Sequence, residues 1–175
     1  MFGRFFGKGP PARPAPDAVL RLKYEPVPTN APAFAADIVE STRRIDGADL
    51  DYSPASLDEV DRIIEGFRIE GLTPHQIGET VFGFGCYVGE VFVRNAGGRW
   101  RMTSETPMRT IAGHALVIEL PNENFTNPLG KAFKRLANGP VDSLAYFYQA
   151  TLAGRQSGPT EGGTPPARPR DISQP

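Results

Sequence analysis

Hydrophobic residues recur at helical spacing in the first half of the chain. In residues 33–46, the side chains of Phe34, Ile38 and Ile45 can share one face of a helix, and Gly47 follows as its stop. This spacing predicts an amphipathic helix whose apolar face is directed towards a core.

A second helical pattern begins with a capping box. Ser56 and Glu59 stand at the S-x-x-E spacing, in which each side chain binds the backbone N–H of the other residue. Apolar residues then follow at helical spacing, opposite acidic and basic ones, at Leu57, Val60, Ile64 and Phe67. Gly71 ends the pattern, which therefore predicts a second amphipathic helix.

The third segment is the most apolar and is rich in glycine. Thr73 and Gln76 form a second capping box around Pro74, which suits the first position of a helix. The helix that follows is apolar over most of its circumference and contains Gly78, Gly83, Gly85 and Gly89. Each interior glycine costs up to about 1 kcal/mol of helix propensity, so we expect other elements of the same chain to approach closely there.

The second half of the chain changes to strand spacing and then back to helices. After a turn at residues 95–98 we expect a strand over residues 99–102 and another over residues 114–120, with a short strand or a loop between them. Asn127-Pro128 and Asp142 then begin two more helices. This order predicts an α+β fold, a single domain in which about five helices pack on a small antiparallel sheet.

Composition limits that domain to the middle of the chain. The 175 residues suffice for one domain with a sizeable core. Residues 1–29 hold six of the 18 prolines, and residues 155–175 hold five more among Gly, Ser and Thr. Both ends have little apolar surface to offset the entropy of ordering, so we expect two disordered tails around a globular domain of residues 30–154.

The net charge of −1 conceals an uneven distribution. Residues 30–154 carry 11 basic and 16 acidic side chains, whereas residues 1–29 carry five basic and two acidic ones. An acidic domain repels phosphate backbones, so nucleic acid is not an expected partner. The basic and aromatic N-terminal cluster around Phe5 and Phe6 fits contact with another protein or, less readily, with an anionic membrane surface.

Residue types that bind metals or form covalent links are scarce. One cysteine, Cys86, excludes an intrachain disulfide and a cysteine-rich zinc site, and two histidines, His75 and His114, supply a metal site poorly. No metal and no cofactor are therefore expected. The sequence also shows neither a bilayer-spanning apolar run nor the apolar centre of a signal peptide, so we expect a cytoplasmic protein.

One sector of the third helix carries polar side chains that converge. Glu90 and Arg94 stand at i and i+4 in the favourable order, and Tyr87 lies one turn away. One interpretation is a ligand-binding site, with Glu90 as acceptor or base, Tyr87 as donor and Arg94 as an anion clamp. The other is an internally satisfied ion pair that orients a packed helix. Trp100 has the same two interpretations, an exposed anchor for a partner or a core residue.

Other candidates have structural alternatives too. Cys86 is a nucleophile if His75 or His114 lies beside it, and otherwise a buried core residue. The carboxylates of Glu79, Glu90 and Glu119 would serve Mg²⁺ or glycoside chemistry if the fold gathered them. Lys131, Lys134 and Arg135 are predicted to form the outward face of their helix, either solvated or in contact with an acidic partner.

A resemblance adds to these patterns. The run Gly85-Cys86-Tyr87-Val88-Gly89-Glu90, followed by Gly97-Gly98 and Trp100, resembles a group of small uncharacterised bacterial domains. In that group a G-x-Y-x-G-E helix leads through a Gly-Gly turn to a tryptophan strand. The likeness covers about residues 50–150 and implies kinship of fold but no reaction. An excess of arginine over lysine, 15 to 4, is also consistent with a GC-rich bacterial genome.

The function that these patterns favour is a non-enzymatic binding or protein-interaction domain of a bacterial cytoplasm, acting on a protein partner. Two alternatives stay open. One is a small hydrolase or transferase that uses Tyr87, Glu90 and Arg94. The other is an immunity-type protein that neutralises its partner.

Overall fold

The computed structural model describes residues 20–110, 113–121 and 123–156. Five α-helices and a three-stranded antiparallel sheet form one α+β domain, as the sequence predicts. The elements are α1 (Ala31–Asp46), α2 (Ser56–Ile69), α3 (Pro74–Ala96), β1 (Arg99–Met102), β2 (Leu116–Leu120), β3 (Asn124–Thr126), α4 (Pro128–Asn138) and α5 (Leu144–Gln156). Of the tails expected at residues 1–29 and 155–175, residues 1–19 and 157–175 lie outside the described residues.

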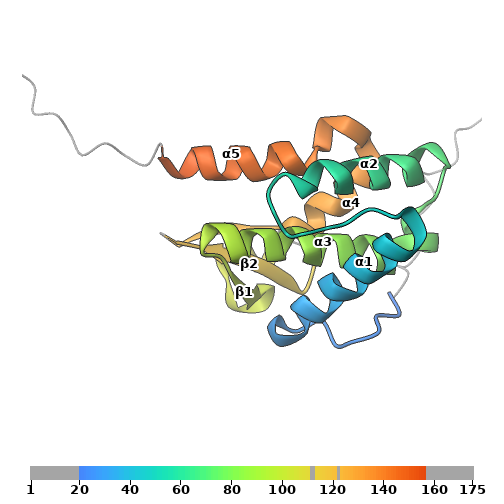
Figure 1. Ribbon diagram of the computed structural model, residues 1–175. Helices are drawn as coiled ribbons and strands as arrows, with labels where there is room; N and C mark the ends of the chain where they lie inside the picture. The colour runs from blue at the N-terminus through green and yellow to red at the C-terminus, as the bar shows by residue number, and fades with distance from the viewer. Residues whose placement is uncertain (1–19, 111–112, 122, 157–175) are drawn as a thin grey trace, which may run out of the picture.

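Helix α3 runs through the middle of the molecule. Figure 1 shows α2 and α5 on one side of it, with α4 between, and α1 and the sheet on the other side. In the sheet, β2 is central, and its Glu119 lies opposite Arg99 of β1 on one side and Phe125 of β3 on the other. A short strand or a loop was expected between the first two strands, and the segment forms two short 3-10 turns. The third strand, β3, follows β2 instead, at a place where the sequence did not predict one.

The glycines of α3 are the points at which its neighbours make contact. A Cβ atom built on any of four glycines would come within 3.0 Å of a side chain from another part of the fold. The pairs are Gly78 with Leu20, Gly83 with Ile38, Gly85 with Leu129 and Gly89 with Trp100. The prediction of close approach is therefore confirmed, and each glycine admits a different segment.

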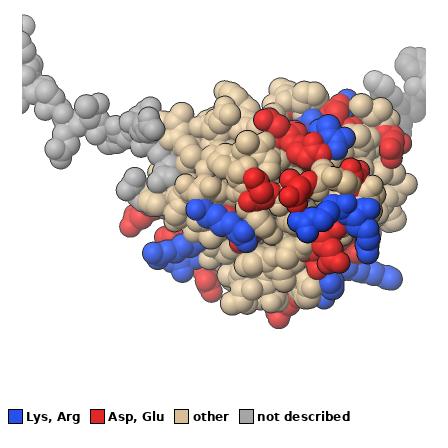
Figure 2. Space-filling model, in the orientation of Figure 1, with Lys and Arg blue, Asp and Glu red and all other residues tan. Residues whose placement is uncertain are grey.

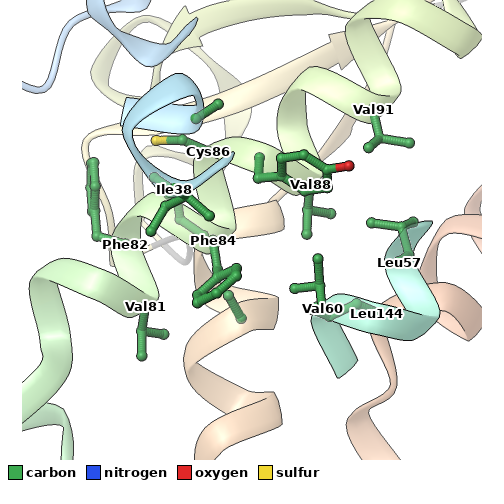
Figure 3. Close-up of a cluster of buried hydrophobic side chains, with 14 of the residues drawn as sticks. Ile38, Leu57, Val60, Val81, Phe82, Phe84, Cys86, Val88, Val91 and Leu144 are labelled. Carbon is green, nitrogen blue, oxygen red and sulfur yellow. The ribbon is translucent and has the colours of Figure 1, made fainter. Parts of the chain in front are cut away.

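The core forms around the apolar side chains of α3. Figure 3 shows Val81, Phe84 and Val88 of α3 in one cluster with Val60 of α2 and Leu144 of α5. All five are almost completely buried. Full burial of a side chain of this size contributes about 1.5–3 kcal/mol, so these contacts stabilise the packing of α2 and α5 on α3.

The start of α3 has the capping box that the sequence predicts, whereas the start of α2 does not. The box at Thr73 is confirmed, because the side chain of Gln76 accepts the backbone N–H of Thr73 at 3.0 Å. The box at Ser56 is wrong, since Ser56 is already the first helical residue and its hydroxyl donates to the carbonyl of Ser53 at 2.6 Å. Glu59 pairs with Arg62 instead, at 2.9 Å.

The predicted apolar face of α1 is correct at Phe34 and Ile38 and wrong at Ile45. Phe34 and Ile38 are buried, but Ile45 is 74% exposed. The buried row continues at i+4 steps to Thr42, so Ile45 in the last turn falls beside the core rather than on it.

The packed part of the chain begins before residue 30, where the domain was expected to start. Leu20, Leu22 and Tyr24 are partly buried against the core, and the Tyr24 ring meets the edge of Phe34 at a centroid distance of 5.2 Å. Residues 20–24 therefore belong with the domain. Because prolines flank these residues, their alternation of apolar and charged side chains did not indicate a packed segment.

Candidate functional site

The predicted polar cluster exists, but most of it lies inside the molecule. Tyr87 is fully buried and Glu90 is 4% exposed, because α1, α2 and the sheet surround this part of α3. Arg94, one turn further on, has a side chain that is 47% exposed. The cluster therefore runs from the core to the surface along one side of α3.

Both oxygens of the Glu90 carboxylate are bonded within the protein. Oε1 accepts the indole Nε1–H of Trp100 at 2.9 Å, and Oε2 accepts Nε–H of Arg94 at 3.3 Å. A buried carboxylate is costly without such donors. Glu90 thus links α3 to β1 and holds Arg94 in one orientation.

Trp100 can pack against α3 because residue 89 is a glycine. Its indole ring packs on Gly89, where any side chain would collide with it, and its N–H reaches Glu90. Trp100 is partly buried against the core, so its interpretation as a core contact fits better than that as an exposed anchor. Its ring packs between the sheet and α3, and the hydrogen bond from its indole N–H to Glu90 fixes the orientation of the ring.

Tyr52, which the sequence did not single out, completes the cluster. Its ring stacks on that of Tyr87 at a centroid distance of 4.8 Å and an interplanar angle of 26°. The guanidinium of Arg94 lies over the Tyr52 ring at 3.4 Å from its centroid. The cluster therefore contains a column of Tyr87, Tyr52 and Arg94, with the cation at its outer end.

The backbone of Tyr52 is held in the left-handed region, with φ of 61°. Its N–H donates to the hydroxyl of Tyr87 at 2.8 Å, and its carbonyl accepts from the side chain of Asn95 at 2.9 Å. A tyrosine pays a conformational penalty in this region, and these two bonds offset it. No sequence pattern marks this position, because the bonds come from residues 35 and 43 positions away.

The hydroxyl of Tyr87 has internal partners too. Besides the N–H of Tyr52, it bonds the hydroxyl of Ser56 at 2.5 Å. Burial raises the pKa of the Tyr87 hydroxyl above its usual value, so the phenol is neutral at neutral pH. Tyr87 therefore positions the segment between α1 and α2, and does not offer a donor to a ligand.

Cys86 does not have the surroundings of a nucleophile. Its side chain is 0% exposed, and burial raises the pKa of the thiol well above its usual value. His114 stacks on Phe133 of α4 at 5.0 Å, and His75 is exposed in the first turn of α3. The interpretation of Cys86 as a core residue is the one that fits.

The three carboxylates considered for Mg²⁺ or glycoside chemistry lie in different places. Glu79 is exposed near the start of α3, about 16 Å along the helix axis from Glu90. Glu119 of β2 pairs with Nε of Arg101 at 2.6 Å. Across the described parts of the chain, no three His, Cys, Asp or Glu side chains gather into a possible metal site.

A second polar cluster, which the sequence did not predict, joins α2, α4 and α5. Arg135 was predicted to face outwards, but it is 4% exposed and donates from Nε to Asp61 at 2.8 Å and from Nη1 to Glu65 at 2.6 Å. The nearby guanidinium groups of Arg68 and Arg135 lower the pKa of Glu65 to about 2. The prediction failed because the acidic partners stand some 70 residues earlier in the chain.

Asp61 also fixes the start of α5. Its carboxylate accepts the backbone N–H groups of Leu144 and Ala145 at 2.9 and 3.2 Å, and the hydroxyl of Ser143 at 2.8 Å. The positive end of a helix favours a carboxylate there. A single side chain of α2 thus caps α5 and neutralises a buried arginine of α4.

The largest depression described on the surface lies away from both clusters. Its volume is about 470 Å³, and it is lined by Leu20, Arg21 and residues 75–80 at the start of α3. It has no contact with Glu90 or with the exposed end of Arg94. Over the same described ranges, no helix combines the length and the apolar character required to cross a membrane.

Comparison with known proteins assigns no role to these two clusters. No family model, no curated protein and no solved structure matches this chain. The resemblance to small bacterial domains with a G-x-Y-x-G-E helix therefore stays a prediction, and any function has to be inferred from the arrangement of the chain's own residues.

Proposed function

We propose that this protein is a non-enzymatic interaction domain that holds an acidic side chain of a protein partner against Arg94. The observation that supports this most is the fixed orientation of Arg94. Its guanidinium rests on Tyr52 at 3.4 Å and is bonded to Glu90 through Nε, while 47% of the side chain stays exposed.

A fixed arginine is well suited to binding a carboxylate. The bond to Glu90 uses one of the five N–H donors of the guanidinium. A side chain that is already ordered loses little further entropy when a partner binds, and Arg beside Tyr is a common combination at interface hot spots. Of the four predicted site residues, Arg94 is thus the contact residue, and Tyr87, Glu90 and Trp100 position it.

The buried state of Glu90 argues against the hydrolase or transferase alternative. A catalytic carboxylate has to come within hydrogen-bond distance of its substrate. Glu90 is 4% exposed, and both of its oxygens already accept bonds. We therefore do not propose a reaction at this cluster.

The proposed setting is the cytoplasm of a bacterium. Its support is the arginine-rich composition and a single buried cysteine, which is typical of a reducing compartment. An immunity-type role would use the same contact with a toxic protein as the partner, and a toxin gene next to this gene would distinguish it.

The test is purification of the intact protein from its own host, followed by native mass spectrometry. We expect a second protein bound to the wild type at fixed stoichiometry and lost from Arg94→Gln. The matched control is Arg62→Gln on α2, because Arg62 is also an exposed arginine in an ion pair with a glutamate of its own helix. This control keeps the partner if the contact is specific.

Three results would contradict the proposal. The first is a partner retained by Arg94→Gln, and the second is a wild type that carries no partner. The third is turnover of a substrate by purified protein that Glu90→Gln abolishes while its thermal unfolding remains cooperative.

A further inference from the structure

A smaller depression lies at one end of the sheet, where β1 passes into two 3-10 turns. Its volume is about 270 Å³, and it is lined by residues 102–104, Arg109 and residues 113–115. The backbone N–H of Thr103 donates to the carbonyl of Ala115 at 2.8 Å, which extends the pairing of β1 with β2. The two segments around the depression are therefore held together by the sheet.

Thr103, which lines the depression, has a buried hydroxyl without a hydrogen-bond partner. Thr103 is 6% exposed, and among the described residues its Oγ1 is the one buried side-chain oxygen or nitrogen atom that bonds to no other group. The position of the residue is fixed, because its backbone bonds both Ala115 and the N–H of Thr106. An unpaired buried hydroxyl is costly. A ligand in the depression that accepted this hydroxyl, after rotation of the side chain between staggered conformations, would remove that cost.

The other polar side chains around the depression also have unused donors. Among the described residues, the side chains of Ser104, Arg109 and His114 form no hydrogen bond or ion pair. The His114 ring is nevertheless held in place, because it stacks on Phe133 of α4 at 5.0 Å. Burial lowers the pKa of His114, so its imidazole is neutral at neutral pH and has one N–H to donate. Four side chains with unused donors therefore border one depression.

The three other depressions described on the surface differ in this respect. In each of them at least one polar lining side chain is already bonded inside the protein. The pairs are Glu119 with Arg101, Lys23 with Asp37, and Gln76 with Thr73. Of these four depressions, the one beside Thr103 therefore has the polar lining groups that are best able to bind a ligand.

We infer that this depression binds the phosphate group of a small molecule. Among the described residues that line it, Arg109 is the one charged side chain, and a guanidinium supplies several N–H donors to an oxyanion. The hydroxyls of Thr103 and Ser104 and the N–H of His114 add donors from three other positions. A phosphate group can accept all of these bonds, because it has more free oxygens than the two of a carboxylate.

Size and charge favour a small molecule over a nucleic acid. A volume of about 270 Å³ far exceeds the roughly 30 Å³ that one water molecule takes up, so an organic part fits beside the phosphate. Residues 30–154 carry 11 basic and 16 acidic side chains, and on the face shown in Figure 2 the Lys and Arg side chains are interspersed with Asp and Glu. Such a surface repels a phosphate polymer, whereas a single phosphate needs only Arg109 as its cation.

Nuclear magnetic resonance of the two histidines tests the site in the full chain. Inorganic phosphate is added at constant pH and ionic strength, in exchange for chloride. We expect the imidazole C–H signals of His114 to shift until the site is saturated, and those of His75, which is exposed at the start of α3, to stay unchanged. Glycerol 3-phosphate is the second probe. Tighter binding of this probe supports a phosphate ester as the natural ligand, and equal binding supports free phosphate.

Two substitutions should each weaken phosphate binding by at least roughly tenfold, which is the worth of one hydrogen bond to a charged group. Arg109→Gln removes the cation, and Thr103→Val removes the hydroxyl at nearly unchanged shape. The matched controls are Arg99→Gln, an exposed arginine at a different depression, and Arg94→Gln, the proposed partner contact. Both controls are expected to bind phosphate like the wild type, so this inference and the proposed function are tested separately.

Urea unfolding separates the loss of a ligand contact from damage to the fold. Thr103→Val is expected to keep or raise the urea midpoint, because it removes a hydroxyl that has no partner among the described residues. Thr106→Val is the comparison and is expected to lower the midpoint, since Oγ1 of Thr106 donates to the carbonyl of Thr103 at 2.9 Å.

The inference is overturned if phosphate shifts the signals of neither histidine or of both equally. It is also overturned if Arg109→Gln or Thr103→Val binds phosphate as tightly as the wild type. Acetate that binds this site as tightly as phosphate would overturn the assignment to a phosphate group.

Discussion

Helices α3 and α5 are both strongly apolar and both contain glycine, but they are covered in different ways. In α3 each of four glycines lies against a side chain of another segment, and residues 81–92 are all buried. In α5 a Cβ atom on Gly154 would meet no atom of the described residues within 4 Å, and Tyr146, eight residues earlier, is 67% exposed. Apolar composition alone therefore does not show where a helix packs, whereas the surroundings of its glycines do.

The largest loss of stability is expected from removing the side chain of Asp61, which bonds both α4 and α5. Asp61→Ala removes the cap of α5 and one of the two carboxylates on the buried Arg135, which we expect to cost about 3 kcal/mol of unfolding free energy. Urea unfolding measures the loss, and hydrogen exchange would show faster exchange of the α5 amides. Asp58→Ala, on the exposed side of the same helix, is the control and is expected to change little.

Filling a glycine of α3 is the direct test of its close contacts. Gly89→Ala places a methyl group inside the Trp100 ring, so one of the two has to move, at an expected cost of about 2 kcal/mol. Urea unfolding again gives the value, and the fluorescence of Trp100, the one tryptophan in the chain, reports its displacement. A variant as stable as the wild type would contradict the role that we assign to this glycine.

A smaller change in stability is expected when the pH is lowered, through His114, which stacks on Phe133 of α4. Burial lowers the pKa of His114 below its usual 6.5, so the unfolded chain takes up a proton before the folded one does. The free energy of unfolding should therefore fall as pH decreases below about 6.5, by less than about 1.4 kcal/mol for each pH unit.

The two histidines allow this pH dependence to be assigned. Urea unfolding between about pH 7 and pH 5.5 should show a shallower dependence in His114→Leu than in the wild type. His75→Gln is the control, since His75 is exposed. If both variants retained the slope of the wild type, His114 would not be its source.

The smallest effect is expected where a glycine has no neighbour. Gly154→Ala should raise the unfolding free energy by a few tenths of a kcal/mol up to about 1, because alanine is the better helix former and its Cβ would meet no atom of the described residues within 4 Å. Gly66→Ala in α2 is the comparison, since its Cβ would also meet nothing within 4 Å. Destabilisation by either substitution would show that an open glycine is constrained in some other way.

Much of the candidate site could be predicted from the sequence, because its central residues stand on one helix. The 3.6-residue period places Tyr87, Glu90 and Arg94 on one side of α3, and the glycine-rich turn returns Trp100 to the same helix. Tyr52 could not be predicted, because it joins from a loop whose left-handed backbone is held by bonds to residues far along the chain. The same reason explains Asp61 and Arg135, whose pairing spans 74 positions.

The sequence by itself determined the order of helices and strands, the glycine positions at which a close neighbour was needed, and the residues that could form a polar cluster. These follow from local periodicity and from the conformational limits of glycine and proline. Only the tertiary structure decided that Glu90 is enclosed rather than accessible, that Arg135 points inwards, and that α5 has an open side. Burial and pairing depend on which distant segments meet, and no local pattern contains that information.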